Sequence, residues 1–527
     1  MKRRAFVAGT ASAAAIASAW PAASQAPRAA LDWCGSAPEP LRLPGRDGWF
    51  ARTVPADRPL VLRAGRAPAG TPGPWRNAFA CEDSGRLLLN PTLVATTGDR
   101  WRIELVNALD EPTIAHWHGL ANDAHNDGAR TLVAPGGRHR YDFVVRERAG
   151  LYWYHPHPHG MTAAQTYDGL FGMIEVNDGD ERALRRALDV VPGATELLLV
   201  LQDRAGDAYA SDAFDRHHGR LGDVPAINGC LDPFLDVGSR AYRLRIVNAA
   251  NARTFRLGFR DDSGRRVPFA LVGTDGGLLA APVPCDECFL SPAERVDLVV
   301  DFSAARPGRT YVMETGAFDP MHTRTPDDAP RNETEHHAAA GMRDTASRTH
   351  GRWPEGVRRD LMTFRVRERV VARAALPERL SAVDRIDVAN ARERPLRMGF
   401  NKGRWRINDR VFAMDESPIE VTRDTTEVWL LRNYHTSMPH AMHLHGFRFQ
   451  VLERETSPDA LAPLAVHPGA RLATDLGWKD TVLVWPGESV RIAIRFALPF
   501  PGAQDYLFHC HNLEHEDGGM MLGVRVV

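Results

Sequence analysis

A short stretch near the end of the chain combines several kinds of metal ligand. Residues 506–521 read YLFHCHNLEHEDGGMM and contain, in order, His509, Cys510, His511, His515 and Met520. Successive side chains on a strand point to opposite faces, so His509 and His511 would share one face and Cys510 would lie on the other. The segment can therefore serve two metal centres, which the backbone of Cys510 joins covalently.

The thiol of Cys510 is the group that distinguishes copper from the other candidate metals. Imidazoles alone suit copper, zinc, iron or nickel, but a thiolate with two histidines and a weak axial methionine is the ligand set of a blue-copper electron-transfer site. Cys510, His515 and Met520 supply three of these ligands. His440 is the most plausible fourth, because it precedes His443 by three residues and is oriented differently from the 443/445 pair. The pattern predicts that Cys510 receives an electron and its histidine neighbours pass it on.

Histidines two residues apart are over-represented. Random placement of the 21 histidines would give about one His-x-His pair, whereas five occur, at 116/118, 155/157, 157/159, 443/445 and 509/511. Side chains two residues apart on a strand share a face, so each pair can present two imidazoles together. One such pair could be a surface accident or a hydrogen-bonded core group, but five favour a metal cluster.

The elements that must position these residues form a loose threefold repeat. Residues 98–107, 238–248 and 423–433 each begin with a turn, continue as an alternating β-rich run and end in asparagine. Histidine motifs follow the first and third of these segments but not the second, so the middle unit is interpreted as a spacer. Three such units, with a polar run at 319–355, predict an all-β protein of three tandem Greek-key β-sandwich domains.

Bulk composition fits several soluble domains. A chain of 527 residues is too long for one ordinary core. Its net charge of −1 gives no electrostatic reason to expect nucleic acid or an anionic membrane as a partner. No apolar stretch of about 20 residues follows the N-terminal region. We expect a soluble protein, a monomer, that acts on small molecules.

The first 30 residues are interpreted as a signal peptide. They combine a basic start, an Ala-rich apolar stretch and small residues near Ala17 to Ala19. Arg3 and Arg4 resemble a twin-arginine signal, which would export the protein folded to the periplasm or beyond; an ordinary signal or a disordered tail is the alternative. In an oxidising compartment some of the other cysteines can pair, although spacing does not say which. These cysteines are Cys34, Cys81, Cys230, Cys285 and Cys288.

Four motifs resemble the copper motifs of the multicopper oxidases, a family that includes laccases and bacterial copper-tolerance oxidases. They read HWHG (116–119), YHPHPHG (154–160), MPHAMHLHG (438–446) and HCHNLEHEDGGMM (509–521). The resemblance implies three cupredoxin-like domains, which we place at 50–178, 190–356 and 375–527. It further implies four copper ions: one type 1 ion in the third domain, and a cluster of one type 2 and two type 3 ions between the first and third domains.

The resemblance also implies a ligand for each position. The type 1 ligands would be His440, Cys510, His515 and Met520, and the type 2 ligands His116 and His443. The type 3 ligands would be His118, His155, His157, His445, His509 and His511. His159 shares a face with His155 and His157, but the family pattern leaves it out.

Two carboxylates are candidates for proton transfer, because reducing O₂ to water consumes protons. By resemblance, Asp127 would lie near the type 2 copper and Glu516 would feed protons to the type 3 side. A solvated surface role is the alternative for an acid next to a histidine. Many relatives have proline after this Asp-Gly, whereas this chain has Ala129 and Arg130, which puts the loop shape in question.

The sequence therefore predicts an exported, laccase-like multicopper oxidase that passes electrons from phenolic or aromatic-amine donors to O₂. The alternatives are a cuprous oxidase in copper tolerance and a non-catalytic copper-binding protein. The donor depends on what covers the type 1 edge. Residues 319–350 are a candidate cover, either a polar loop or a sparse Cu(I) site built from Met321, His322, His336, His337, Met342 and His350.

Overall fold

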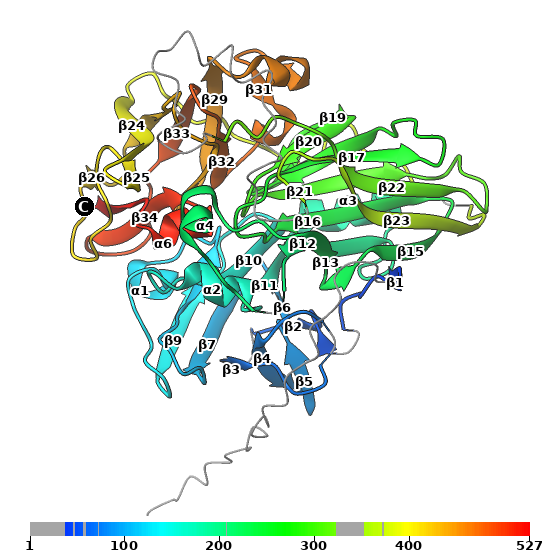
Figure 1. Cartoon of the computed structure of the whole chain (residues 1–527), viewed down its shortest axis with the longest axis horizontal. Coiled ribbons are helices and arrows are strands. Elements are labelled where there is room, and N and C mark those ends of the chain that lie inside the picture. Colours follow the sequence, from blue (N-terminus) through cyan, green and yellow to red (C-terminus); the bar gives the residue numbers. More distant parts are fainter. Residues whose placement is uncertain are drawn as a thin grey trace, which may run out of the picture.

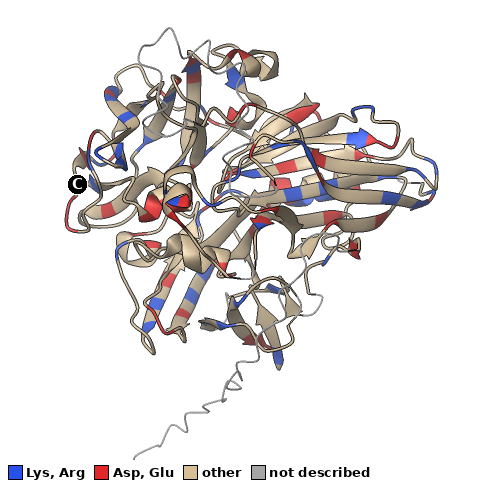
Figure 2. Cartoon of the chain, viewed as in Figure 1, with Lys and Arg blue, Asp and Glu red and all other residues tan. Residues whose placement is uncertain are grey.

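The structure is a computed structural model that describes residues 37–45, 48–55, 59–71, 73–206, 208–322, 353–371 and 374–527. Strands dominate, and six sheets form three cupredoxin-like domains (Figure 1). The predicted all-β class and three-domain architecture are confirmed. Among the described residues no helix is long and apolar enough to cross a membrane. Basic and acidic residues are interspersed over all three domains (Figure 2).

The first domain has two five-stranded sheets, ordered β5-β4-β3-β7-β9 and β2-β6-β11-β10-β8. Its strands are β2 (Arg52–Thr53), β3 (Leu60–Arg66), β4 (Asn77–Asp83), β5 (Arg86–Leu89), β6 (Thr92–Thr96), β7 (Arg100–Asn107), β8 (Ala115–His118), β9 (Arg138–Val144), β10 (Gly150–Pro156) and β11 (Gly172–Asn177). Two short helices accompany them, α1 (Ala124–Asp127) and α2 (Thr162–Tyr167).

The middle domain has sheets ordered β1-β15-β23-β22-β17-β20 and β14-β13-β12-β16-β21-β18-β19. Its strands are β1 (Glu39–Pro40), β12 (Glu196–Arg204), β13 (Val224–Ile227), β14 (Cys230–Leu231), β15 (Pro233–Gly238), β16 (Ala241–Asn248), β17 (Phe255–Asp261), β18 (Phe269–Thr274), β19 (Gly277–Cys285), β20 (Glu287–Leu290), β21 (Arg295–Asp301), β22 (Thr310–Thr315) and β23 (Arg359–Glu368). β23 pairs with β22 and β15, so this sheet continues beyond the predicted boundary at residue 356.

Two helices belong to the same part of the chain, α3 (Gly179–Leu188) and α4 (Ala213–His218). The stretch between the first two domains is thus partly helical. Leu184 and Leu188 of α3 pack into the core of the middle domain, so α3 is anchored to that domain.

The third domain has sheets ordered β25-β24-β27-β33-β29 and β26-β35-β34-β28-β32, with a small β30-β31 pair. Its strands are β24 (Arg392–Asn401), β25 (Arg404–Ile407), β26 (Ile419–Val421), β27 (Thr426–Asn433), β28 (His440–Leu444), β29 (Phe449–Glu455), β30 (Ala465–His467), β31 (Arg471–Leu472), β32 (Thr481–Val484), β33 (Ser489–Arg495), β34 (Gln504–Cys510) and β35 (Met521–Val526). Its helices are η4 (Asp459–Leu464), η5 (Ala473–Asp475) and α6 (Leu513–Asp517).

The threefold sequence repeat corresponds to one structural unit. The repeated runs form β7, β16 and β27, and each pairs antiparallel with a later strand of its own domain, β9, β21 or β33. The closing asparagines Asn107, Asn248 and Asn433 are buried. Each amide donates hydrogen bonds to two backbone carbonyl oxygens, at 2.8–3.0 Å, and one of the two belongs to the loop that follows the asparagine. The repeated asparagine therefore closes the same loop three times.

Some sequence-based expectations fall outside the described residues. The signal peptide at 1–30 and Cys34 lie there, as do residues 323–350 of the candidate cover. Among the cysteines that the structure describes, Cys81, Cys285, Cys288 and Cys510 are buried free thiols, and Cys230 is also buried.

Candidate metal centres

The thiol of Cys510 faces two imidazoles. Its Sγ lies 3.5 Å from Nδ1 of His440 and 3.7 Å from Nδ1 of His515. All three side chains are fully buried, and Met520 is buried in the same core cluster. This arrangement brings together Cys510, His440 and His515, and the backbone N–H of Cys510 donates to the carbonyl oxygen of Met520, the fourth expected type 1 residue, at 3.1 Å.

The other ring nitrogens of these two histidines are fixed by hydrogen bonds. Nε2 of His440 lies 3.0 Å from the hydroxyl oxygen of Ser437, and Nε2 of His515 lies 2.9 Å from the carbonyl oxygen of His217. The indole of Trp405 donates to that same carbonyl at 2.8 Å. These contacts leave both Nδ1 atoms directed at the thiol, because a hydrogen bond to the other ring nitrogen fixes the direction of a histidine ring.

A second group of eight buried histidines lies between the first and third domains. Their ligand atoms form three sets, each within 4.8 Å: His116, His118 and His443; His118, His155 and His511; and His157, His445 and His509. The structure thus brings together all eight residues expected to hold the type 2 and type 3 ions.

Strand pairing explains how distant motifs meet. In the first domain β8 pairs with β10, which places His116 opposite His155. In the third domain β28 pairs with β34, which places His443 opposite His509. The two histidine-bearing pairs face each other, and His509 and His511 on either side of Cys510 enter different three-histidine sets.

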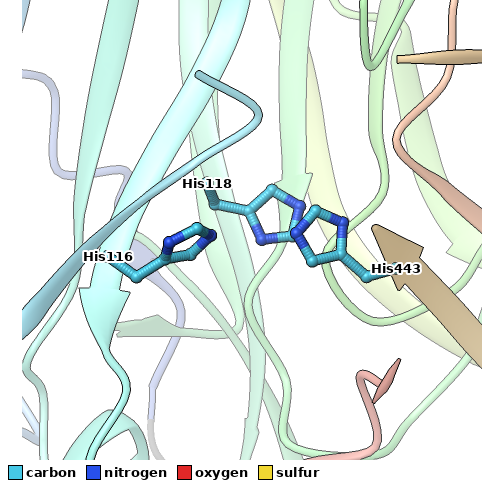
Figure 3. A group of neighbouring side chains, drawn as sticks. All are labelled: His116, His118 and His443. Atoms are coloured by element: carbon cyan, nitrogen blue, oxygen red, sulfur yellow. The ribbon is translucent and has the colours of Figure 1, made fainter. Parts of the chain in front are cut away.

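Hydrogen bonds also orient the cluster histidines. Nδ1 of His116 lies 2.8 Å from the carbonyl oxygen of Asp127, and Nδ1 of His443 lies 2.8 Å from that of Asp480. The Nε2 atoms of both rings are buried and have no hydrogen-bond partner. Figure 3 shows the rings of His116, His118 and His443 directed toward a common space. A buried imidazole nitrogen that has no hydrogen-bond partner is suited to binding a metal.

Burial keeps these imidazoles neutral. It lowers the pKa of His116 from 6.5 to about 4, and the pKa of His511 to about 3. Burial likewise lowers the pKa of His118, His443 and His509 well below the usual range. Metal binding requires the neutral form, so no proton has to be displaced at neutral pH.

Asp127 contacts the cluster. Its Oδ2 lies 2.9 Å from Nδ1 of His445, and burial raises the pKa of this carboxyl well above its usual value. Gly128 follows with φ +80°, and a Cβ there would lie 2.1 Å from the carbonyl oxygen of Ala115, so only glycine fits. This loop lacks the proline that many relatives have. In this chain the Arg130 guanidinium donates hydrogen bonds to the carbonyl oxygens of Met414 and Glu416, which ties the loop to the third domain.

Glu516 contacts two other histidines of the cluster. Its oxygens lie 3.5 Å from Nε2 of His157 and 3.4 Å from Nδ1 of His509. Burial raises the pKa of this carboxyl well above its usual value. A carboxyl that holds its proton near neutral pH can act as a general acid. His159, by contrast, is exposed and belongs to none of the three-histidine sets.

Sequence reasoning missed two residues that contact candidate ligands. Trp405 packs against His440 and His515, with ring centroids 4.8 and 4.9 Å away. Asp480 lies 3.2 Å from Nε2 of His118. Neither residue belongs to a histidine motif. The sequence shows Asp480 only as a single acid directly before the apolar strand β32. This signal is weak, because it is the pairing of β32 with β28 that places Asp480 beside the cluster.

Known proteins are similar to this chain in sequence and in structure. Sequence patterns of the multicopper oxidases match residues 85–181 and 387–527. The crystal structure of the McoA multicopper oxidase from Aquifex aeolicus is 30% identical, superposes with a TM-score of 0.79, and covers 93% of this chain and 100% of its own. The chain belongs to the multicopper oxidase family. It is therefore an oxidoreductase that uses O₂, and the predicted family and enzyme class are confirmed.

Two further multicopper oxidase relatives bear names that concern substrates. A laccase from Haloferax volcanii is 31% identical over 440 residues, which cover 78% of this chain and 66% of the relative. A structure described as the laccase-like CueO of Ochrobactrum sp., with oxidase activity towards lignin model compounds and lignosulfonate, is 27% identical with a TM-score of 0.71. It covers 93% of this chain and 100% of its own.

The donor set of this multicopper oxidase fits copper. One thiol with two imidazoles and a thioether suits a blue-copper ion, and the eight-imidazole cluster is buried and presents unpartnered nitrogens. An exclusively oxygen-based set, which magnesium or calcium would prefer, is not what these sites offer.

Proposed function

We propose that this multicopper oxidase is laccase-like. It oxidises phenolic and aromatic-amine donors one electron at a time beside Cys510, and reduces O₂ to water with four electrons at the histidine cluster. Four bound copper ions would supply the electron carriers, one at Cys510 and three at the cluster. The donor and O₂ are its small-molecule partners.

An aromatic pocket beside the Cys510 site carries the proposal about the donor. It is open, measures about 660 Å³, and is lined by Phe214, Phe400, Trp405 and His515, among others. Aromatic walls favour a flat aromatic ring by offset or edge-to-face contact. Because His515 contributes both to this pocket and to the Cys510 site, a bound ring would lie next to an electron-accepting ligand.

Other residues have proposed roles in electron transfer, proton supply and the orientation of the histidines. His509 and His511 connect Cys510 to two histidine sets through the backbone. Glu516 holds a proton against His157 and His509, where O₂ reduction requires one. Asp127 holds His445 with its carboxylate and His116 with its carbonyl oxygen. Buried walls keep bulk water away from the cluster.

The names of two relatives support a phenolic donor, the laccase of H. volcanii and the Ochrobactrum enzyme with activity towards lignin model compounds. The decisive experiment measures copper per chain and compares O₂ uptake with a methoxyphenol and with Cu(I). We expect four copper ions and a higher kcat/KM for the phenol. One copper or fewer would exclude the oxidase cluster, and a preference for Cu(I) would make the chain a cuprous oxidase.

We also propose that the protein is exported in the folded state and acts as a monomer. The twin-arginine-like residues Arg3 and Arg4 support export. Changing both to lysine should retain the enzyme in the cytoplasm, as measured by fractionation of the producing cells.

A further inference from the structure

The middle domain contributes none of the candidate ligands, yet one of its side chains reaches the cluster through an intermediary. Arg295 is the first residue of β21 and is 1% exposed. Its guanidinium forms a two-pronged ion pair with the Asp480 carboxylate of the third domain: Nη1 donates to Oδ1 at 2.8 Å, and Nη2 donates to Oδ2. Two parallel hydrogen bonds of this kind fix direction as well as charge.

The Asp480 carboxylate in turn contacts a candidate ligand of the first domain. Oδ1 lies 3.2 Å from Nε2 of His118 and also accepts from the hydroxyl of Thr481 at 2.9 Å. A carboxylate can only accept, so Nε2 of His118 must carry the proton. Nδ1 of His118 is then left with its lone pair, and it lies 3.4 Å from Nε2 of His155, within the set that also contains His511.

The remaining donors of Arg295 are also occupied. Nε donates to the carbonyl oxygen of Leu151, Nη1 to that of Ala293, and Nη2 to that of Asp275. The first of these acceptors lies in the first domain and the other two in the middle domain. The guanidinium is therefore held from two domains, and its planar fork cannot rotate away from Asp480.

A second set of buried ion pairs holds the segment around Asp480. Lys479, next to Asp480, lies 2.9 Å from Asp275 and 2.7 Å from Glu294 of the middle domain. The Asp275 carboxylate also accepts from the backbone N–H of Arg295 at 2.8 Å. The position of Asp480 is thus fixed from both sides by middle-domain residues.

We propose that Arg295 is a positioning residue for the oxygen-reducing cluster: by holding Asp480, it fixes the tautomer and ring direction of His118, so that Nδ1 is the ligand atom. All three domains contribute to the orientation of this one ligand: His118 belongs to the first domain, Asp480 to the third and Arg295 to the middle domain. The middle domain is therefore more than a spacer. The inference rests on the proposed copper function.

The test compares Arg295→Met with Arg243→Met. Arg243 is an equally buried middle-domain arginine, but its carboxylate partners Glu181, Glu196 and Asp297 touch none of the candidate ligands. Copper-free protein is titrated with copper, and the measurements are blue absorbance per chain, total copper per chain, the EPR spectrum of the cluster, and the melting temperature.

For Arg295→Met we expect unchanged blue absorbance, an altered EPR spectrum and roughly tenfold weaker loading of cluster copper, the lower end for losing the partner of a metal ligand. Arg243→Met should lose thermal stability but load its cluster normally. Arg295→Lys should recover only part of the loading, because lysine offers one charge without the fork.

Full cluster loading with an unchanged EPR spectrum in Arg295→Met would overturn the proposal, as would an equal loss in Arg243→Met. If Arg295→Met does not fold, the double variant Arg295→Met/Asp480→Asn removes both charges together, and it must still underload the cluster. A wild-type protein with one copper or fewer would instead refute the proposed function, so the two failures are distinguishable.

Discussion

Glu516 Oε1 lies 3.5 Å from Nε2 of His157, while its other oxygen lies 3.4 Å from His509. The carboxyl therefore bridges one histidine of the first domain and one of the third. Because burial raises its pKa well above the usual value, the proposed role of this carboxyl is to hold a proton for O₂ reduction. Glu516 differs from an ordinary buried acid because both of its oxygens lie near candidate metal ligands.

Glu516→Gln should slow the reoxidation of reduced enzyme by O₂ at least tenfold, since general acid–base assistance is worth about 10²–10⁴-fold. The amide keeps the shape but cannot cycle a proton, so copper content and colour should stay unchanged. Stopped-flow mixing with O₂ measures the rate. Glu514→Gln is the matched control, because that buried carboxylate bonds Asn251 and Tyr209 instead. Equal rates in both variants would remove Glu516 from proton delivery.

Cys510→Ser should abolish the blue colour and donor turnover while retaining much of the cluster copper. The thiolate produces the charge-transfer absorbance, and the three-histidine sets do not include Cys510. Visible spectra and metal analysis check this. Cys288→Ser is the control, since Cys288 is also a buried free thiol but lies in another domain. A blue Cys510→Ser protein would contradict the assignment of the type 1 site.

Local patterns in the sequence predicted the three-domain fold and the histidine pairs that lie together in the structure. Alternation along a strand is a local property, so the opposite faces of Cys510 and its neighbours could be read from spacing alone. The four motifs likewise marked the eight histidines that the structure brings together in three buried sets, because each motif carries its own pair.

Contacts made across domains could not be predicted in this way. Asp480 reaches His118 across 362 positions of sequence, and Arg295 reaches Asp480 across 185. Such contacts depend on how three sandwiches pack, which no local periodicity encodes. The same limit explains why the middle domain was interpreted as a spacer. Trp405 lies in the same domain as His440 and His515 and was missed because it belongs to no histidine motif.

Arg404→Ala should weaken the binding of anionic aromatic donors selectively. Arg404 is exposed and lines the pocket beside His515, together with Arg216. An exposed charge contributes about 0.2–1 kcal/mol, so KM for a carboxylated methoxyphenol should rise up to roughly fivefold, and less at high salt. The neutral methoxyphenol should be little affected. Arg406→Ala is the control, because Arg406 lies on the same strand but not in the pocket lining. Equal KM changes for both donors would exclude charge recognition.

His218→Phe should make the protein more resistant to acid. Burial, then the neighbouring His322 and His217, lowers the pKa of His218 from 6.5 to about 3. The unfolded chain binds this proton near pH 6.5 while the folded protein does not, so protonation favours unfolding, and stability falls as pH drops from 6.5 toward 3. Phenylalanine carries no proton and retains contact with Phe214, whose ring lies 4.3 Å away.

The advantage of the His218→Phe variant should be negligible at pH 7.5 and grow to about 1.4 kcal/mol at pH 5.5, one pH unit below the ordinary histidine pKa. Melting temperatures of the copper-loaded wild type and variant, measured side by side at several pH values, test this. The candidate copper ligands are the same in both proteins, so their own titration cancels in the difference. A gap that stays constant between pH 7.5 and 5.5 would show that His218 titrates alike in the folded and unfolded chain, contrary to its buried position beside two other histidines.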